Sequence, residues 1–158
     1  MPSGTSELIL AALLAAALCL AAATDWKRRE IDDWLNIAIA LAAPLFWWAT
    51  GLPVWPDMAI QIALAALAFA VFAGLFALGA MGGGDVKLIG ALALWFAPLD
   101  LLRLLIAMSL IGGALTLLML VRQKALKLPG KPEIPYGIAI ALAGLWALCE
   151  RYLNHFGQ

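Results

Sequence analysis

Six stretches of mostly apolar residues constrain the fold of this chain more than any other feature. They cover 8–24, 34–50, 58–80, 85–98, 99–121 and 136–153. A helix of about 17–25 apolar residues is long enough to cross the hydrocarbon core of a bilayer. The fourth stretch is shorter than this, and the other five meet the requirement. We therefore predict an all-α, polytopic membrane protein with six transmembrane helices, forming a single domain over 1–158.

The composition excludes several other classes of protein. Hydrophobic residues make up 65% of the chain and charged residues 13%, whereas a soluble domain is about half apolar and a quarter charged. The formal net charge is zero, so no overall field attracts nucleic acid. One histidine and two cysteines are too few for a tetrahedral Cys/His zinc site. We expect the lipid bilayer as a partner, and no metal or cofactor.

The distribution of lysine and arginine predicts the orientation. The first apolar stretch has basic residues after it and none before it, so we expect a retained helix rather than a cleaved signal peptide, with the N-terminus outside. The cytoplasmic segments are then 25–33, 81–87 and 122–135. They contain eight of the ten basic residues: Lys27, Arg28, Arg29, Lys87, Arg122, Lys124, Lys127 and Lys131. Only Arg103 and Arg151 remain, near outer helix ends. This asymmetry follows the positive-inside rule and favours a membrane crossing by 85–98.

Two of the ten carboxylates, Asp25 and Asp85, need a special explanation. Asp32 and Asp33 precede the second helix, where we expect them to act as N-caps. Asp25, in contrast, directly ends an apolar stretch, and Asp85 directly begins one. A carboxylate at membrane depth is costly and normally faces a cavity or a partner. In the predicted topology both lie at the cytoplasmic face, so they can meet across the bundle although they are 60 positions apart.

The triple glycine at 82–84 supports a cavity at this place. Successive glycines break a helix and permit positive φ. Irregular backbone at membrane depth survives only where it is buried in protein or lines a cavity. We therefore expect the fourth helix to begin below the membrane surface, with Asp85 in a water-filled pocket.

Two close carboxyl groups suit acid–base hydrolysis. They cannot easily both ionise, so one holds a proton while the other stays charged. The charged group can deprotonate a water, and the protonated group can polarise the scissile carbonyl. The same residues also allow a simpler interpretation, in which two interfacial carboxylates are neutralised by neighbouring basic residues, namely Lys27, Arg28, Arg29 or Lys87.

Three motifs resemble those of a known family. The segment GGGDVKL at 82–88 resembles the GxGD-(V/F)-K-L signature of prepilin and preflagellin peptidases. The segment TDWKRREI at 24–31 resembles the first-aspartate motif of that family, and IPYGIAIA at 134–141 is similar to the start of the last helix in its short Tad-type branch. These membrane aspartic peptidases cleave the leader peptide of type IV prepilin-like precursors at the cytoplasmic face of the plasma membrane.

The resemblance implies roles for individual residues. Asp25 and Asp85 would be the catalytic pair. Gly82 and Gly84 match the two glycines of GxGD. Lys87 would tune the protonation of the pair or hold a helix end. Larger relatives carry an extra cytoplasmic segment, often with CxxC pairs, and methylate the new N-terminus. This chain shows no such segment, so we expect no methyltransferase activity.

One departure from the family pattern bears on substrate binding. The family often has Pro-Asn where this chain has Asp32-Asp33. The resemblance therefore does not determine the residue at which the second helix starts. Leaders of this substrate class are basic, and the cytoplasmic loops of the chain are basic too. Recognition of the leader would therefore fall to acidic residues, for which the candidates are Glu30, Asp32, Asp33 and Glu133.

Two functions from other classes stay open. A small proton-coupled transporter also uses paired intramembrane acids, although transporters often contain internal repeats and none is convincing between 1–80 and 81–158. A non-catalytic scaffold for pilus assembly would tolerate loss of either aspartate. A peptidase that uses both aspartates would lose nearly all of its activity when either one is removed.

Overall fold

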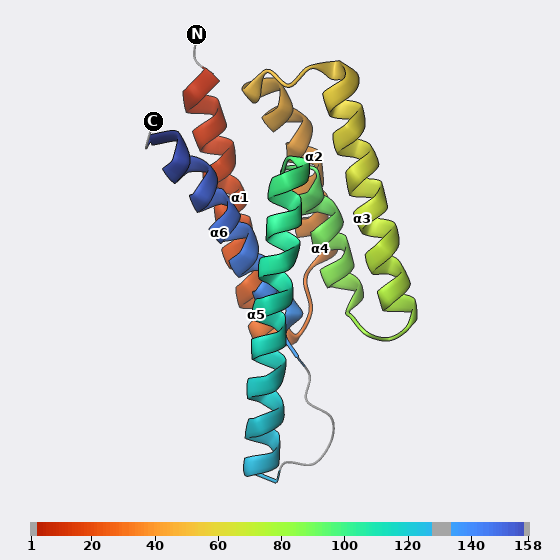
Figure 1. The fold of residues 1–158 in the computed structure, drawn as a ribbon. Helices are drawn as coiled ribbons and strands as arrows, with labels where there is room; N and C mark the ends of the chain where they lie inside the picture. Colours follow the sequence, from red (N-terminus) through yellow and green to blue (C-terminus); the bar gives the residue numbers. More distant parts are fainter. Residues whose placement is uncertain (1–2, 128–133, 157–158) are drawn as a thin grey trace.

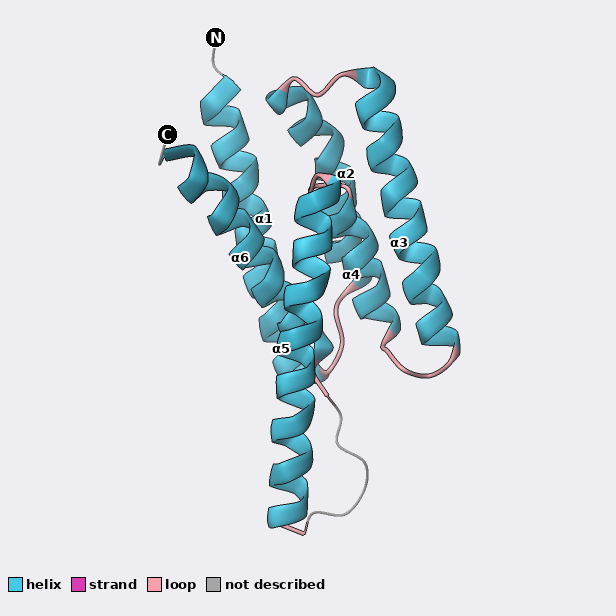
Figure 2. Ribbon diagram, in the orientation of Figure 1, coloured by secondary structure: helices cyan, strands magenta, loops and turns pink. Residues whose placement is uncertain are grey.

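The computed structural model describes residues 3–127 and 134–156, and within them the regular structure is entirely helical (Figure 2). Figure 1 shows that successive helices run in opposite directions and that the first helix begins, and the last helix ends, at the same end of the bundle. The all-α prediction is therefore confirmed for the described residues. The helices are α1 (Ser3–Arg28), α2 (Asp33–Thr50), α3 (Ala59–Ala77), α4 (Gly83–Ala93), α5 (Pro98–Ala125) and α6 (Tyr136–Phe156), with a short π-helical turn, η1 (Val54–Met58), before α3.

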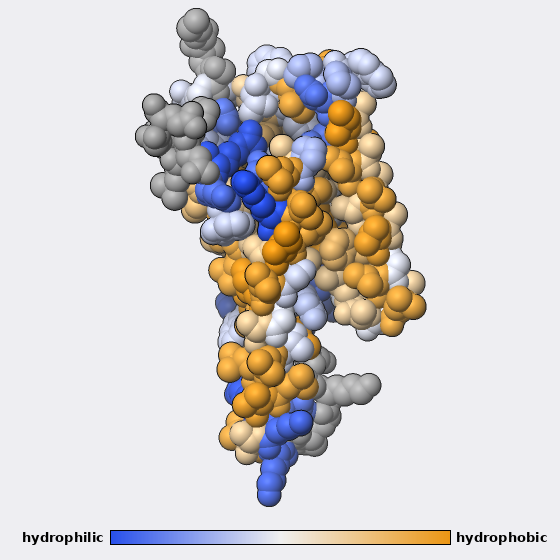
Figure 3. Space-filling model, in the orientation of Figure 1, coloured by the Kyte–Doolittle hydropathy of each residue, from blue (hydrophilic) through white to orange (hydrophobic). Residues whose placement is uncertain are grey.

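Three helical segments of the described chain are long and apolar enough to cross a membrane. They are Gly4–Arg28, Val54–Ala77 and Pro98–Ala125. Apolar side chains cover much of the visible surface of α3 and α5 (Figure 3). These segments indicate a membrane protein, whereas the expected total of six crossings stays a prediction.

The fourth helix is shorter than the sequence predicted. It ends at Ala93 rather than at residue 98, and 94–97 form a turn before α5. Pro98 explains the break, because proline lacks an N–H for an ongoing helix and disfavours helical backbone in the residue before it. Proline suits the first position of a helix, and here it begins α5. That helix continues to Ala125, past the predicted end at 121.

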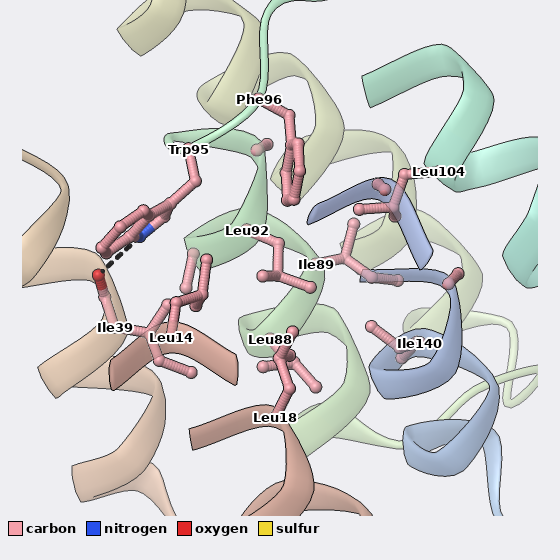
Figure 4. Packing of buried hydrophobic residues seen from close by; sticks show 14 of the residues in the cluster. Leu14, Leu18, Ile39, Leu88, Ile89, Leu92, Trp95, Phe96, Leu104 and Ile140 are labelled. Atoms are coloured by element: carbon pink, nitrogen blue, oxygen red, sulfur yellow. Dashed lines mark hydrogen bonds between the residues drawn. The ribbon is translucent and has the colours of Figure 1, made fainter. Parts of the chain in front are cut away.

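The short helix α4 forms the core of the bundle. Leu88, Ile89 and Leu92 are fully buried, and α4 packs against α2, α3 and α6. Figure 4 shows further apolar side chains around them, from α1, α5 and α6 among other elements. The helix that begins with the candidate Asp85 is thus held in place by its neighbours rather than by lipid.

The C-terminal end of α4 receives hydrogen bonds from side chains of other helices. Trp47 Nε1 of α2 donates to the carbonyl of Leu94 over 2.7 Å. Gln61 of α3 donates to the carbonyls of Ala93, over 3.2 Å, and of Phe96. The last carbonyls of a helix lack partners within it, and at membrane depth each unsatisfied one is costly. These donors therefore allow α4 to end inside the bundle.

Arg103 and Arg151, the two basic residues expected near outer helix ends, have partners within the protein. Arg103 lies 3.6 Å from Asp100 and 3.6 Å from Glu150. Arg151 donates to the carbonyl of Trp95 over 3.5 Å. A hydrophilic patch lies where the start of α5 faces α6 (Figure 3). Ion pairs and a hydrogen bond to a backbone carbonyl, in addition to the expected solvation at the membrane surface, thus explain how these positions accommodate arginine.

Candidate active site

A cavity of about 920 Å³ lies at the end of the bundle where α1 ends and where α4 and α6 begin. Its walls come from segments that are far apart in the sequence: 25 and 28–33, 79–85, and residues 134 and 136. Both Asp25 and Asp85 line it. The structure therefore brings the two aspartates to one site, as the predicted topology required.

Asp25 lies near the end of α1 and is held by the start of α6. Its side chain is 5% exposed. Its Oδ2 accepts a hydrogen bond of 3.1 Å from the backbone N–H of Ile138. The first N–H groups of a helix have no partners within that helix, so the carboxylate completes the start of α6. This contact fixes the position of the carboxyl group at the cavity wall.

Gly137 permits this close approach. A Cβ at this position would lie 2.8 Å from both Cγ and Oδ2 of Asp25. It would also lie 2.8 Å from Cδ1 of Ile31. A side chain of any size would therefore push α6 away from the carboxyl group, or displace that group.

Asp85 lies in the first turn of α4 and is 9% exposed. A Cβ on Gly82 would lie 3.0 Å from Oδ2 of Asp85, so this glycine lets the carboxyl group lie close against the backbone. Both carboxyl groups are buried and line the same cavity.

The three consecutive glycines differ in how tightly they pack. A Cβ on Gly84 would lie 3.2 Å from Cβ of Ile31 and 3.3 Å from its backbone N and O. A Cβ on Gly83 would meet only the ring of Phe76, at 3.4 Å, which is an ordinary contact. The tight positions are therefore Gly82 and Gly84, the two glycines that match the GxGD pattern.

Lys87 pairs with Asp33 at the edge of the cavity and not with Asp25 or Asp85. Its Nζ lies 2.7 Å from Oδ1 of Asp33, and both side chains are largely exposed. The ion pair connects the start of α2 to α4. Lys87 does not belong to the cavity lining, so its observed contact fits the holding of a helix end better than direct contact with the aspartates.

The acidic residues proposed for leader binding have different surroundings. Glu30, Asp32 and Asp33 line the cavity, whereas Glu133 lies outside the described residues. Asp32 occupies the N-cap position of α2, but its side chain makes no capping hydrogen bond. The N-cap prediction for Asp32 is wrong in this respect, because its Oδ2 pairs instead with Arg28 at 2.6 Å.

Sequence reasoning gave no role to two residues that shape the site. Ile31 is buried and contacts both Gly84 and Gly137. Tyr136 lines the cavity and packs on α5, where a Cβ at Gly112 would lie 2.9 Å from its ring. The small-xxx-small spacing of Gly112 and Thr116 was a signal for this close packing. In the described part of the chain, no group of three histidine, cysteine or acidic residues could hold a metal ion.

The described residues form a helical membrane protein in which two buried carboxyl groups line one cavity. Comparison with known families gives a more specific result. The profile of the type IV leader peptidase family matches residues 12–117, a stretch that includes both aspartates. The chain belongs to this family, and membership implies a protease. No curated protein and no solved structure matches the chain significantly.

Proposed function

We propose that this protein is a membrane aspartic endopeptidase that removes the leader peptide of type IV prepilin-like precursors. One observation carries the proposal: Asp25 and Asp85, from different helices, are buried around one cavity in a chain of the leader peptidase family. In the proposed reaction one carboxylate takes a proton from water. The other carboxyl group, still protonated, donates a hydrogen bond to the scissile carbonyl.

We also propose that all six helices lie across the membrane and that the cavity faces the cytoplasm. Basic residues support this orientation, because Arg28 and Arg29 line the cavity and Lys87 lies beside it. Exposed tryptophans flank both ends of α2, with Trp34 at one end and Trp48 at the other. Tryptophan is enriched at both interfaces of a membrane protein. The short helix α4 would lie inside this bundle. There it contacts other helices rather than lipid, so its length need not match the thickness of the bilayer.

Acidic side chains at the cavity would bind a basic leader. Asp32 and Asp33 each pair with a basic residue of the chain itself. A leader lysine or arginine would compete for these carboxylates and for Glu30. Charge reversal by Glu30→Lys should raise KM for the precursor more than it lowers kcat. An unchanged KM would contradict this part of the proposal.

The test is cleavage of a prepilin by the purified protein in liposomes. We expect the wild type to release the leader, and Asp25→Asn and Asp85→Asn to lose this activity, since asparagine keeps the size but not the acid–base capacity. Asp57→Asn is the matched control, because Asp57 lies in η1 outside the cavity. Mass spectrometry of the products identifies the cut.

The result also separates the alternatives. A folded wild type that cleaves none of several prepilins contradicts the peptidase. Loss of a proton flux in the same variants would then favour a transporter, and unchanged pilus assembly by both variants would favour a scaffold.

A further inference from the structure

A second concave region lies beside the cavity, between α2, α3 and α4. It is an apolar groove of about 350 Å³. Ile37 and Ala40 of α2, Phe69 of α3, and Gly90 of α4 contribute to its walls. Ile37 and Phe69 are exposed, so the groove opens to the surroundings of the bundle. In a membrane these surroundings are lipid.

The groove adjoins the cavity at Asp33. Asp33 lines both of them, and Lys87, its ion-pair partner, lines the groove. Asn36 lies one turn further along α2. It lines the groove, and its Nδ2 donates to the carbonyl of Gly84 over 3.4 Å. Gly84 directly precedes Asp85, so Asn36 connects the groove wall to the candidate catalytic turn.

Asn36 also has an unused hydrogen-bonding group. The residue is 3% exposed, and its Oδ1 is a buried side-chain oxygen that has no hydrogen-bond partner among the described residues. A buried polar atom without a partner is unfavourable and needs an explanation. A donor supplied by a bound molecule would satisfy it.

We propose that this groove binds the apolar helix of the precursor, and that Asn36 positions the extended segment leading from that helix to the aspartates. The proposal rests on the proposed function. A peptide substrate must be locally extended to be cut, and extended backbone at membrane depth needs new hydrogen-bond partners. Asn36 lines the groove, and its buried Oδ1, without a partner among the described residues, would accept from such an N–H group once the side chain turns toward the bound segment.

The order of chemical environments supports this occupant. The groove is apolar, and the cavity that shares Asp33 with it contains both candidate carboxyl groups together with further charged residues. A substrate with a membrane helix on one side of its cleavage site and a water-exposed leader on the other matches this order. A lipid acyl chain would fill the groove but would not satisfy Asn36, because it has no donor.

A second groove on the opposite side of α2 provides a matched control. It has a volume of about 210 Å³ and is lined by residues of α1 and α2, with Trp95. It shares no lining residue with the cavity in the described part of the chain. Ala40 lines the first groove and Ala42 the second, and both alanines are half-buried.

The first experiment fills each groove in turn. Ala40→Trp should lower kcat/KM for a membrane-embedded prepilin at least tenfold by blocking the helix, whereas Ala42→Trp should change it less than threefold. Thermal unfolding in detergent checks that both variants fold. Equal cleavage by the two folded variants would overturn the proposal.

The second experiment needs no bulky substitution in the groove. A photo-crosslinking residue replaces Ile37, or Leu41 as the control, in the inactive Asp85→Asn protein. Leu41 is exposed on α2 but lines neither groove. We expect the prepilin to crosslink at 37 and not at 41. Crosslinking at 37 to lipid alone would overturn the proposal.

Cleavage by the wild type in the same liposomes separates the two levels of inference. If the wild type cuts the prepilin but position 37 captures none of it, the groove proposal fails and the proposed function stands. If the wild type cuts nothing, the proposed function itself fails.

Discussion

The carboxylate of Asp25 accepts a hydrogen bond of 3.1 Å from the backbone N–H of Ile138, which lies 113 positions later in the chain. This contact joins the end of α1 to the start of α6. Ile138 lies outside the stretch that matches the family profile, 12–117. The last helix therefore contributes to the position of a candidate catalytic group without supplying a carboxylate itself.

The glycines before Asp85 provide a graded test of the site. Gly84→Ala places a Cβ 3.2–3.3 Å from the backbone and Cβ of Ile31, so either Ile31 or the start of α4, which carries Asp85, must move. A displacement of about 1 Å in a catalytic group can reduce a rate about 100-fold. We expect kcat to fall at least tenfold. Cleavage of a prepilin in liposomes measures it.

Gly83→Ala is the matched control, because its Cβ would make only an ordinary contact of 3.4 Å with Phe76. We expect nearly wild-type cleavage. Equal loss of activity in both variants would show that flexibility of the glycine run matters, rather than its fit against Ile31.

The hydrogen bonds at the end of α4 predict a difference between two adjacent tryptophans. Trp47→Phe removes the donor to the carbonyl of Leu94, whereas Trp48 is 81% exposed. A buried carbonyl without a partner costs about 1–3 kcal/mol. We expect Trp47→Phe to lower the free energy of unfolding by about this amount and Trp48→Phe to change it little. Reversible unfolding in detergent measures both, and equal stability would contradict the role given to Trp47.

The ion pair of Lys87 predicts a modest effect on activity. Its 2.7 Å contact is with Asp33, and both side chains are largely exposed, so the pair contributes about 1 kcal/mol or less. Lys87→Met should reduce cleavage less than tenfold and leave the shape of the pH–rate profile unchanged. A displaced profile would show instead that Lys87 acts on the protonation of the aspartates.

The sequence predicted the helices and the meeting of the aspartates because both depend on patterns along the chain. Long apolar stretches mark the helices, and alternating directions bring Asp25 and Asp85 to the same end. The end of α4 at Ala93 was not predicted. Pro98 breaks the helix, but the exact end also depends on Trp47 and Gln61, which donate from other helices to carbonyls more than 30 positions away, and no local pattern records such contacts.

The finer features of the site also depend on side-chain contacts, some of them local and some between distant segments. Asp32 occupies a capping position, but its side chain pairs with Arg28. The choice between a cap and an ion pair is decided by side-chain geometry, which residue type alone does not specify. The unpaired Oδ1 of Asn36 is visible only once α4 is packed on α2.

The most direct test of the central claim is whether Asp25 and Asp85 act as one catalytic unit. The rate of leader release in liposomes is measured for Asp25→Asn, Asp85→Asn and the double variant. General acid–base groups contribute about 10²–10⁴-fold to a rate, and groups that act together lose their effect together. We predict that each single variant loses at least about 100-fold and that the double variant is no slower than the slower single one. Wild-type cleavage by either single variant, or losses that multiply in the double variant, would contradict a shared catalytic role.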